Sequence, residues 1–256
     1  MTILAETPGH ESFERRIYAH YALVAWVLDY AAAHGREMQE VCRAADREVV
    51  ESVKAKAESG ELRNFVAGAY GSYGQVDVLV YKERNVSTLV PGTSVRAKIA
   101  PHMLKAPELV RGVEFLCKPV GTVEARVPRG YLIPAELGAV AEKLRTHNVR
   151  VEVLAKPVKA AGEEFVVDKI GQGRSGGYSI LKLDGGFAPS PLKEFPAGTF
   201  RVDMAQPLAN VAFYCLEPQA ADGFAGWGVF DEHLKSLGAE KRSVVYPVYK
   251  YFKILE

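Results

Sequence analysis

The spacing of apolar residues predicts that the first part of the chain is helical. Five of them recur at intervals of four, four, three and four positions, which places them on one helical face: Phe13, Ile17, Tyr21, Val24 and Leu28. Gly35 predicts a break after the first helix, and a second amphipathic helix follows over 38–58. The most apolar stretch, 21–33, contains Asp29 and is too short to cross a bilayer, so it predicts a buried helix.

From about residue 64 the pattern changes to short apolar runs broken by glycine and proline, which is typical of strands. Residues 65–70 and 76–81 predict two strands, and the glycine cluster at 71–74 predicts the turn between them. Further strands are predicted over 164–167, 199–202, 211–216 and 243–255. We therefore expect an N-terminal helical region over 1–60 and a β-rich domain over 61–256.

One strand–helix–strand unit is recognisable within the β-rich region. Residues 131–133 predict a strand, and Pro134 suits the first position of the helix that follows. Four apolar residues line one face of this helix: Leu137, Val140, Ala141 and Leu144. Asn148 suits a left-handed cap at its end, and residues 149–153 alternate as a half-buried strand. The predicted fold class is therefore α+β.

The stretch GQGRSGG at 171–177 contains a GxGxxG pattern, which suggests a dinucleotide-binding loop. That interpretation requires a helix to begin directly after the glycines. Residues 178–181 continue instead with a strand-like pattern, so we interpret 171–177 as the loop of a β-hairpin.

The amino-acid composition restricts the classes of function that the chain can have. The 256 residues are 48% hydrophobic and 25% charged, which is ordinary for a globular protein. The net charge of +1 gives no indication of binding to nucleic acid or to a membrane surface. The three cysteines, Cys42, Cys117 and Cys215, are far apart in the sequence and predict buried free thiols. The first residues show no secretory signal pattern.

Several residues suggest metal or ligand binding, and each also has a simpler interpretation. His34 and Glu37 have the spacing of a zinc half-site, with His102 or His147 as a third ligand, but they suit an exposed helix end better. His20 suits a hydrogen-bonded packing position. The carboxylates near the C-terminus suit solvated loops better than a calcium loop: Glu217, Asp222, Asp231 and Glu232.

Aromatic residues gather in the same C-terminal region. Trp227 could form a sugar-stacking platform with Phe224 and Phe230, although a local aromatic core beneath a loop is the commoner arrangement.

Three stretches, in order along the chain, together resemble one family. TILAETPGHESFERRIYAHYALVAWVLDYAAAHG resembles the last strand and final helix of the catalytic domain in large bacterial zinc carboxypeptidases of the carboxypeptidase A-like family. RGYLIPAELGAVAEKLRTHNVRVEVL resembles a strand–helix–strand that follows this domain. FPAGTFRVDMAQPLANVAFYCLEPQAADGFAGWGVFDEHL resembles the C-terminal β region of those enzymes.

The resemblance implies a catalytic role for Glu6. In that family a glutamate at the end of a strand is the general base that activates the zinc-bound water, and Glu6 in ILAE matches its position. The chain would then begin with the helical remnant of an α/β peptidase domain. The family's zinc ligands all precede this glutamate, so none can be assigned here. We expect zinc in the complete enzyme, none on this chain, and no activity from this chain alone.

Two functions are consistent with these observations. In the first, the chain is the C-terminal portion of a zinc carboxypeptidase that acts on peptides, and its N-terminal helices pack on an upstream peptidase segment or associate with a second copy. Family members are often exported. In the alternative, the β-rich domain is a non-catalytic module for binding or protein interaction. Neither function involves nucleic acid or a membrane.

Overall fold

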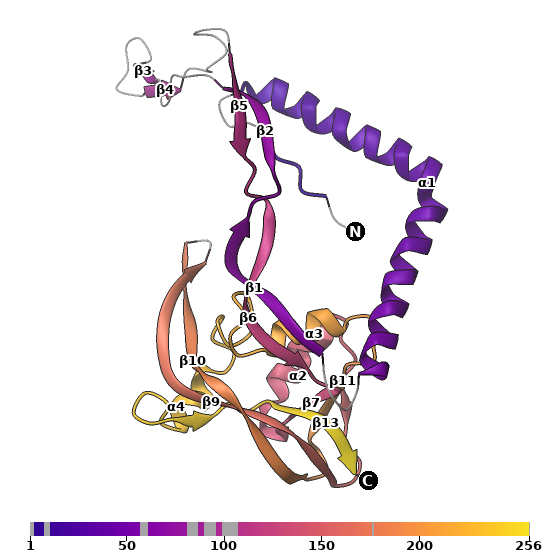
Figure 1. Ribbon diagram of the computed structural model, residues 1–256, viewed down its shortest axis with the longest axis vertical. Coiled ribbons are helices and arrows are strands. Elements are labelled where there is room, and N and C mark those ends of the chain that lie inside the picture. The colour runs from indigo at the N-terminus through magenta and orange to yellow at the C-terminus, as the bar shows by residue number, and fades with distance from the viewer. Residues whose placement is uncertain are drawn as a thin grey trace. The chain divides into compact units, whose positions relative to one another are not determined.

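The computed structural model describes residues 3–7, 11–56, 61–80, 87–89, 96–98, 107–175 and 177–255 (Figure 1). It has a helix near the N-terminus and a strand-rich remainder, which confirms the α+β class. Contacts between residues divide the chain into two compact units. One comprises Met1–Arg43 and Tyr70–Lys118, and the other comprises Ala44–Ala69 and Pro119–Glu256.

One helix, α1 (Phe13–Ala55), replaces the two that were predicted. Ser12 caps its start, because the Ser12 hydroxyl accepts a hydrogen bond of 3.3 Å from the Arg15 amide. The predicted break at Gly35 is wrong. A glycine inside a helix costs only about 1 kcal/mol relative to alanine, and strong helix formers lie on both sides of it, AAA before and EMQE after.

The prediction that the first part of α1 is buried is also wrong. Its apolar side chains are exposed, including Tyr21 at 72% and Trp26 at 61%. Only near its C-terminal end does the helix join a core, where Val53 is buried and Val49 packs against the same cluster. Within the described part of the chain, no helix combines the length and the apolar character needed to span a membrane.

The strands nearest α1 in sequence form three two-stranded sheets. They are β1 (Glu61–Gly71) with β6 (Lys118–Val127), β2 (Gln75–Val80) with β5 (Glu108–Glu114), and β3 (Ser87–Leu89) with β4 (Arg96–Lys98). The predicted strands at 65–70 and 76–81 are present as β1 and β2, apart from residue 81, which lies outside the described residues, but they do not pair with each other. Asp77 on β2 instead accepts hydrogen bonds of 3.0 Å from Arg111 and from the Gly112 amide on β5.

The second unit contains a seven-stranded sheet in the order β10-β9-β13-β7-β11-β8, with β12 also paired to β9. Its elements along the chain are β7 (Gly130–Ile133), η2 (Ala135–Leu137), α2 (Gly138–Thr146), β8 (Glu152–Val153), β9 (Val158–Ser175), β10 (Tyr178–Phe195), β11 (Phe200–Asp203), α3 (Ala209–Leu216), α4 (Asp231–Ser236), β12 (Val244–Val245) and β13 (Tyr249–Leu255). Figure 1 shows β9 and β10 as one long hairpin, with α4 beside it.

The predicted strand–helix–strand unit is present. Strands β7 and β8 both run antiparallel to β11, which lies between them, so they are parallel to each other. Three of the four predicted apolar residues of the connecting helix are buried, namely Val140, Ala141 and Leu144. Asn148 adopts the predicted left-handed backbone, with φ of 60°. The second strand is shorter than predicted, because only Glu152–Val153 pairs.

Two other local predictions are only partly correct. Residues 171–177 belong to a hairpin, as predicted, but the strands remain paired as far as Ser175 and Tyr178. Residues 211–216, predicted as a strand, form most of helix α3. Its buried residues have the i, i+3, i+4, i+7 spacing of a helix face: Ala209, Ala212, Phe213 and Leu216.

Candidate functional site

Glu6 lies in a short segment without regular secondary structure that is hydrogen-bonded to helix α1. The His20 ring contacts the carbonyl oxygen of Ala5 at 3.3 Å and that of Arg16 at 3.0 Å. Arg16 also donates a hydrogen bond of 3.4 Å to the Thr7 hydroxyl. His20 is thus hydrogen-bonded, as predicted, and these contacts hold the residues on both sides of Glu6. The Glu6 side chain is exposed and forms no hydrogen bond or ion pair with described residues.

His34 and Glu37 lie in the middle of α1, so the predicted helix end there is wrong. The His34 Nδ1 and Glu37 Oε2 atoms are 3.3 Å apart, both side chains are exposed, and the His34 ring stacks on Tyr30. His102 lies outside the described residues, and His147 caps the end of α2. Among residues whose placement is described, no three His, Cys, Asp or Glu side chains come together as metal ligands. The described residues therefore do not fit a zinc site.

A buried cluster of charged residues is the least expected feature of the second unit. Glu217 directly follows α3 and is 0% exposed, and Lys250 on β13 is 1% exposed. The Lys250 Nζ atom lies 2.9 Å from Glu217 Oε1 and 3.7 Å from Glu163 Oε1 on β9. The Tyr131 hydroxyl donates a hydrogen bond of 2.6 Å to Glu217. The prediction that Glu217 is a solvated loop carboxylate is wrong.

The Lys250 ammonium has two further partners. It donates a hydrogen bond of 3.1 Å to the carbonyl oxygen of Arg126, and it lies 3.6 Å from the centroid of the Phe187 ring. Oxygen atoms and an aromatic ring thus surround the ammonium, which compensates part of the cost of burying the charge.

Burial controls the protonation of this cluster. It raises the pKa of Glu217, and the nearby Lys250 ammonium opposes that change. Burial lowers the pKa of Lys250, and the Glu217 carboxylate opposes it. It also raises the pKa of Tyr131 and of Tyr246 well above their usual value. The charged groups have almost no solvent exposure. We therefore assign the cluster a structural role, in which it holds β7, β9, β13 and α3 together, and no role in contact with a ligand.

The three cysteines are free, as predicted, but only one of them is shielded from solvent. Cys42 and Cys117 are exposed, which contradicts the prediction of buried thiols, and Cys215 on α3 is half-buried. Burial raises the pKa of the Cys215 thiol to about 11. This thiol is therefore protonated and a poor nucleophile near neutral pH.

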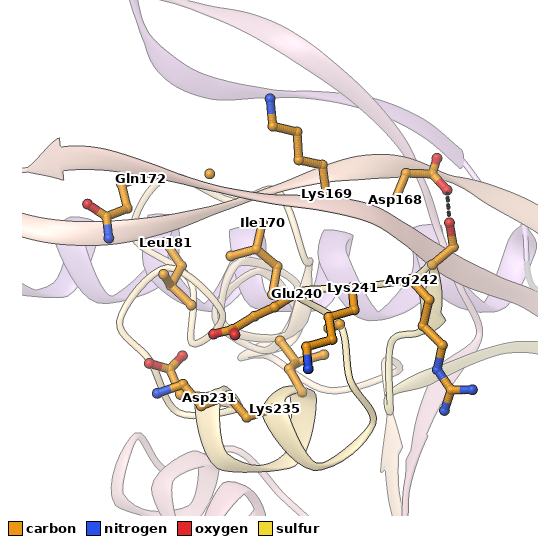
Figure 2. Close-up of a pocket in the computed structure, with 14 residues that line it drawn as sticks. Asp168, Lys169, Ile170, Gln172, Leu181, Asp231, Lys235, Glu240, Lys241 and Arg242 are labelled. Atoms are coloured by element: carbon orange, nitrogen blue, oxygen red, sulfur yellow. Dashed lines mark hydrogen bonds between the residues drawn. The ribbon is translucent and has the colours of Figure 1, made fainter.

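A cavity of about 800 Å³ separates strands β9 and β10 from α4 and the segment that follows it. Figure 2 shows Lys235, Glu240 and Lys241 on the α4 side, opposite Ile170 and Leu181 of the hairpin. At one end the Ser243 hydroxyl donates a hydrogen bond of 2.9 Å to Asp168. The lining contains cationic and anionic side chains together with apolar ones.

The aromatic residues of the C-terminal region divide into two groups. Phe224 and Phe230 are 7% and 1% exposed and belong to the main core, as the aromatic-core interpretation predicted. Trp227 is 47% exposed, and its ring centroid lies 5.9 Å from that of Tyr178, which is 68% exposed. Tyr178 could not be recognised as a neighbour of Trp227 from the sequence, because it lies on β10, far from Trp227 in the chain.

No family model, curated protein or solved structure matches this chain at a significant level.

Proposed function

We propose that this chain is the C-terminal part of a zinc metallocarboxypeptidase that hydrolyses peptides, with Glu6 as its general base. The proposal rests on the sequence resemblance, and one structural observation supports it above others. The Glu6 carboxylate is exposed and has no partner among the described residues, while contacts to α1 hold Ala5 and Thr7 on either side of it. A general base needs both a fixed backbone and a free carboxylate.

The role proposed for Glu6 is proton transfer. Its carboxylate accepts a proton from the water that attacks the scissile carbonyl, and then delivers that proton to the leaving amine. In the complete enzyme, zinc would polarise the same water and carbonyl group. We assign no zinc ligand to this chain.

The surface next to Glu6 is consistent with a missing partner. A groove of about 430 Å³ runs between Thr7 and the apolar side of α1. We define the α1 apolar surface as Phe13, Ile17, Tyr21, Val24 and Leu28, all of which are more than half exposed. Contiguous apolar surface of this kind marks an interface in a folded protein, and the rest of a peptidase domain would cover it.

We expect the isolated chain to self-associate through the α1 apolar surface. Sedimentation velocity should give a mass above the 28.0 kDa of one chain, and an Ile17→Lys/Val24→Lys variant should sediment as a monomer because the added charges oppose burial of this face. Ala22→Lys/Ala33→Lys adds the same charge on the opposite side of the helix and should leave association unchanged. A wild-type chain that stays monomeric at high concentration contradicts this prediction.

The polypeptide purified from its natural source tests the proposed function directly. Its intact mass, zinc content and release of the C-terminal residue from an N-blocked dipeptide should be measured together. We expect a mass above 28.0 kDa, one zinc per polypeptide, and hydrolysis that a chelator abolishes. A native polypeptide of 28.0 kDa that shows no hydrolysis, alone or with its co-purifying proteins, would refute the proposal.

A further inference from the structure

Trp227, whose exposed ring contacts the exposed ring of Tyr178, lines a second, smaller cavity. This cavity has a volume of about 180 Å³ and lies beside Trp227, between the β9–β10 hairpin and the start of α4. The Leu181 amide donates a hydrogen bond of 2.9 Å to the carbonyl oxygen of Gly226, which fixes the Trp227 segment against β10. Trp227 therefore lies at the edge of the cavity on a backbone segment that is hydrogen-bonded to β10, and the Tyr178 ring lies next to it.

Three polar side chains line this cavity. They are Gln172, Ser179 and Asp231. Within the described part of the chain, the Gln172 amide and the Ser179 hydroxyl have no hydrogen-bond partner. The Asp231 Oδ1 atom is shielded from solvent and also lacks a partner. A shielded carboxylate oxygen without a donor is costly, so this site favours a ligand that supplies hydroxyl or amide protons.

The glycine at position 228 leaves room for the Asp231 carboxylate. It has a φ of 76°, which side chains other than glycine rarely adopt. A Cβ atom at this position would also lie 3.1 Å from Asp231 Oδ2. The turn therefore needs glycine both for its backbone and for the space that the Asp231 carboxylate occupies.

We propose that this site binds a neutral carbohydrate. The C–H face of a sugar ring stacks on Trp227, with Tyr178 extending the aromatic surface. Its hydroxyl groups donate to Asp231 and accept from the Gln172 amide, which satisfies the unpartnered groups.

The charges around the site favour a neutral ligand. The adjoining larger cavity has four cationic and three anionic side chains among the described residues of its lining, so the two signs nearly cancel and a charged ligand of either sign is attracted only weakly (Figure 2). They are Lys169, Lys235, Lys241, Arg242, Asp168, Asp231 and Glu240. A sugar chain that continues from the smaller cavity into the larger one would meet hydrogen-bonding groups of both kinds. This inference does not depend on Glu6 or on peptidase activity.

Binding of defined oligosaccharides to the full chain tests the proposal. The probes are hexaoses of β-1,4-linked glucose, N-acetylglucosamine and xylose, titrated calorimetrically. We expect at least one to bind, and Trp227→Ala and Asp231→Asn each to weaken its affinity by about tenfold or more. The chain has two tryptophans, so a Trp26→Phe variant reports stacking on Trp227 through a change in its fluorescence. Tyr73→Ala removes another exposed aromatic ring and should bind normally.

Three results would overturn the carbohydrate assignment. They are the failure of all three hexaoses to bind, retention of full affinity in a folded Trp227→Ala variant, and sugar binding that leaves the fluorescence of the Trp26→Phe variant unchanged. Hexalysine or hexaglutamate binding that Trp227→Ala abolishes, without binding of any sugar, would assign the site to charged peptides instead. The proposed peptidase function would stand in each case.

Discussion

Glu6→Gln should lower the kcat of the complete zinc enzyme by about 10² to 10⁴-fold, the usual contribution of a general base. Glutamine keeps the shape of the side chain but cannot accept the proton of the attacking water. KM should change little, because the substitution leaves the surface that surrounds residue 6 intact. Steady-state kinetics on an N-blocked dipeptide would measure both parameters.

The structure provides the control for this variant. Glu6 is exposed and has no interaction partner among the described residues, so Glu6→Gln should unfold at the same temperature as the parent. Glu14→Gln changes an equally exposed carboxylate in the first turn of α1 and should retain full activity. Near-normal turnover of Glu6→Gln would remove Glu6 from the mechanism, whereas loss of turnover together with loss of stability would indicate a structural role.

Lys250→Met should lower the free energy of unfolding by about 3–5 kcal/mol, the typical cost of removing one member of a buried ion pair. Methionine preserves much of the side-chain volume but leaves the Glu217 and Glu163 carboxylates without the ammonium that lies between them. The carbonyl oxygen of Arg126 also loses its donor. Urea unfolding followed by circular dichroism would measure the change through the shift in midpoint.

Two further variants separate loss of charge pairing from loss of packing. Glu217→Leu/Lys250→Met removes both partners and should recover part of the lost stability, because the carboxylate left unpaired by the single substitution is gone. Lys159→Met replaces an exposed lysine of β9 in the same sheet and should change stability by less than about 0.5 kcal/mol. Equal instability of the single and double variants would show that charge pairing is not the reason for the effect.

Features set by neighbouring residues were predictable from the sequence. The helix over residues 13–34, the strand–helix–strand unit and the left-handed Asn148 all follow from local spacing and backbone preference. The break at Gly35 was mispredicted because one glycine is outweighed by the helix formers around it. Helix α3 was mispredicted because a short run of apolar residues suits a buried helix as well as a buried strand.

Features that depend on distant residues were not predictable. Strands β1 and β2 follow each other, yet each pairs with a strand far along the chain. Glu217 and Lys250 each resemble an ordinary surface residue in the sequence, and only their meeting in the core reveals the ion pair. Trp227 was recognised as a candidate, but its partner Tyr178 lies at the start of β10, far from Trp227 in the sequence. The assignment of Glu6 still depends on the resemblance and remains a prediction.

The position of β10 at the end of its sheet has a consequence for solubility. Among the described strands, β10 pairs only with β9, and the other edge of an 18-residue strand could recruit strands from other molecules and begin aggregation. The Gly226 carbonyl oxygen covers this edge at the Leu181 amide. Pro189 and Pro191 have no amide hydrogen to donate, and the pairing with β9 shifts register after Asp184 and again after Ser190. These interruptions divide the open edge into short lengths, which protects the folded chain against growth into fibrils.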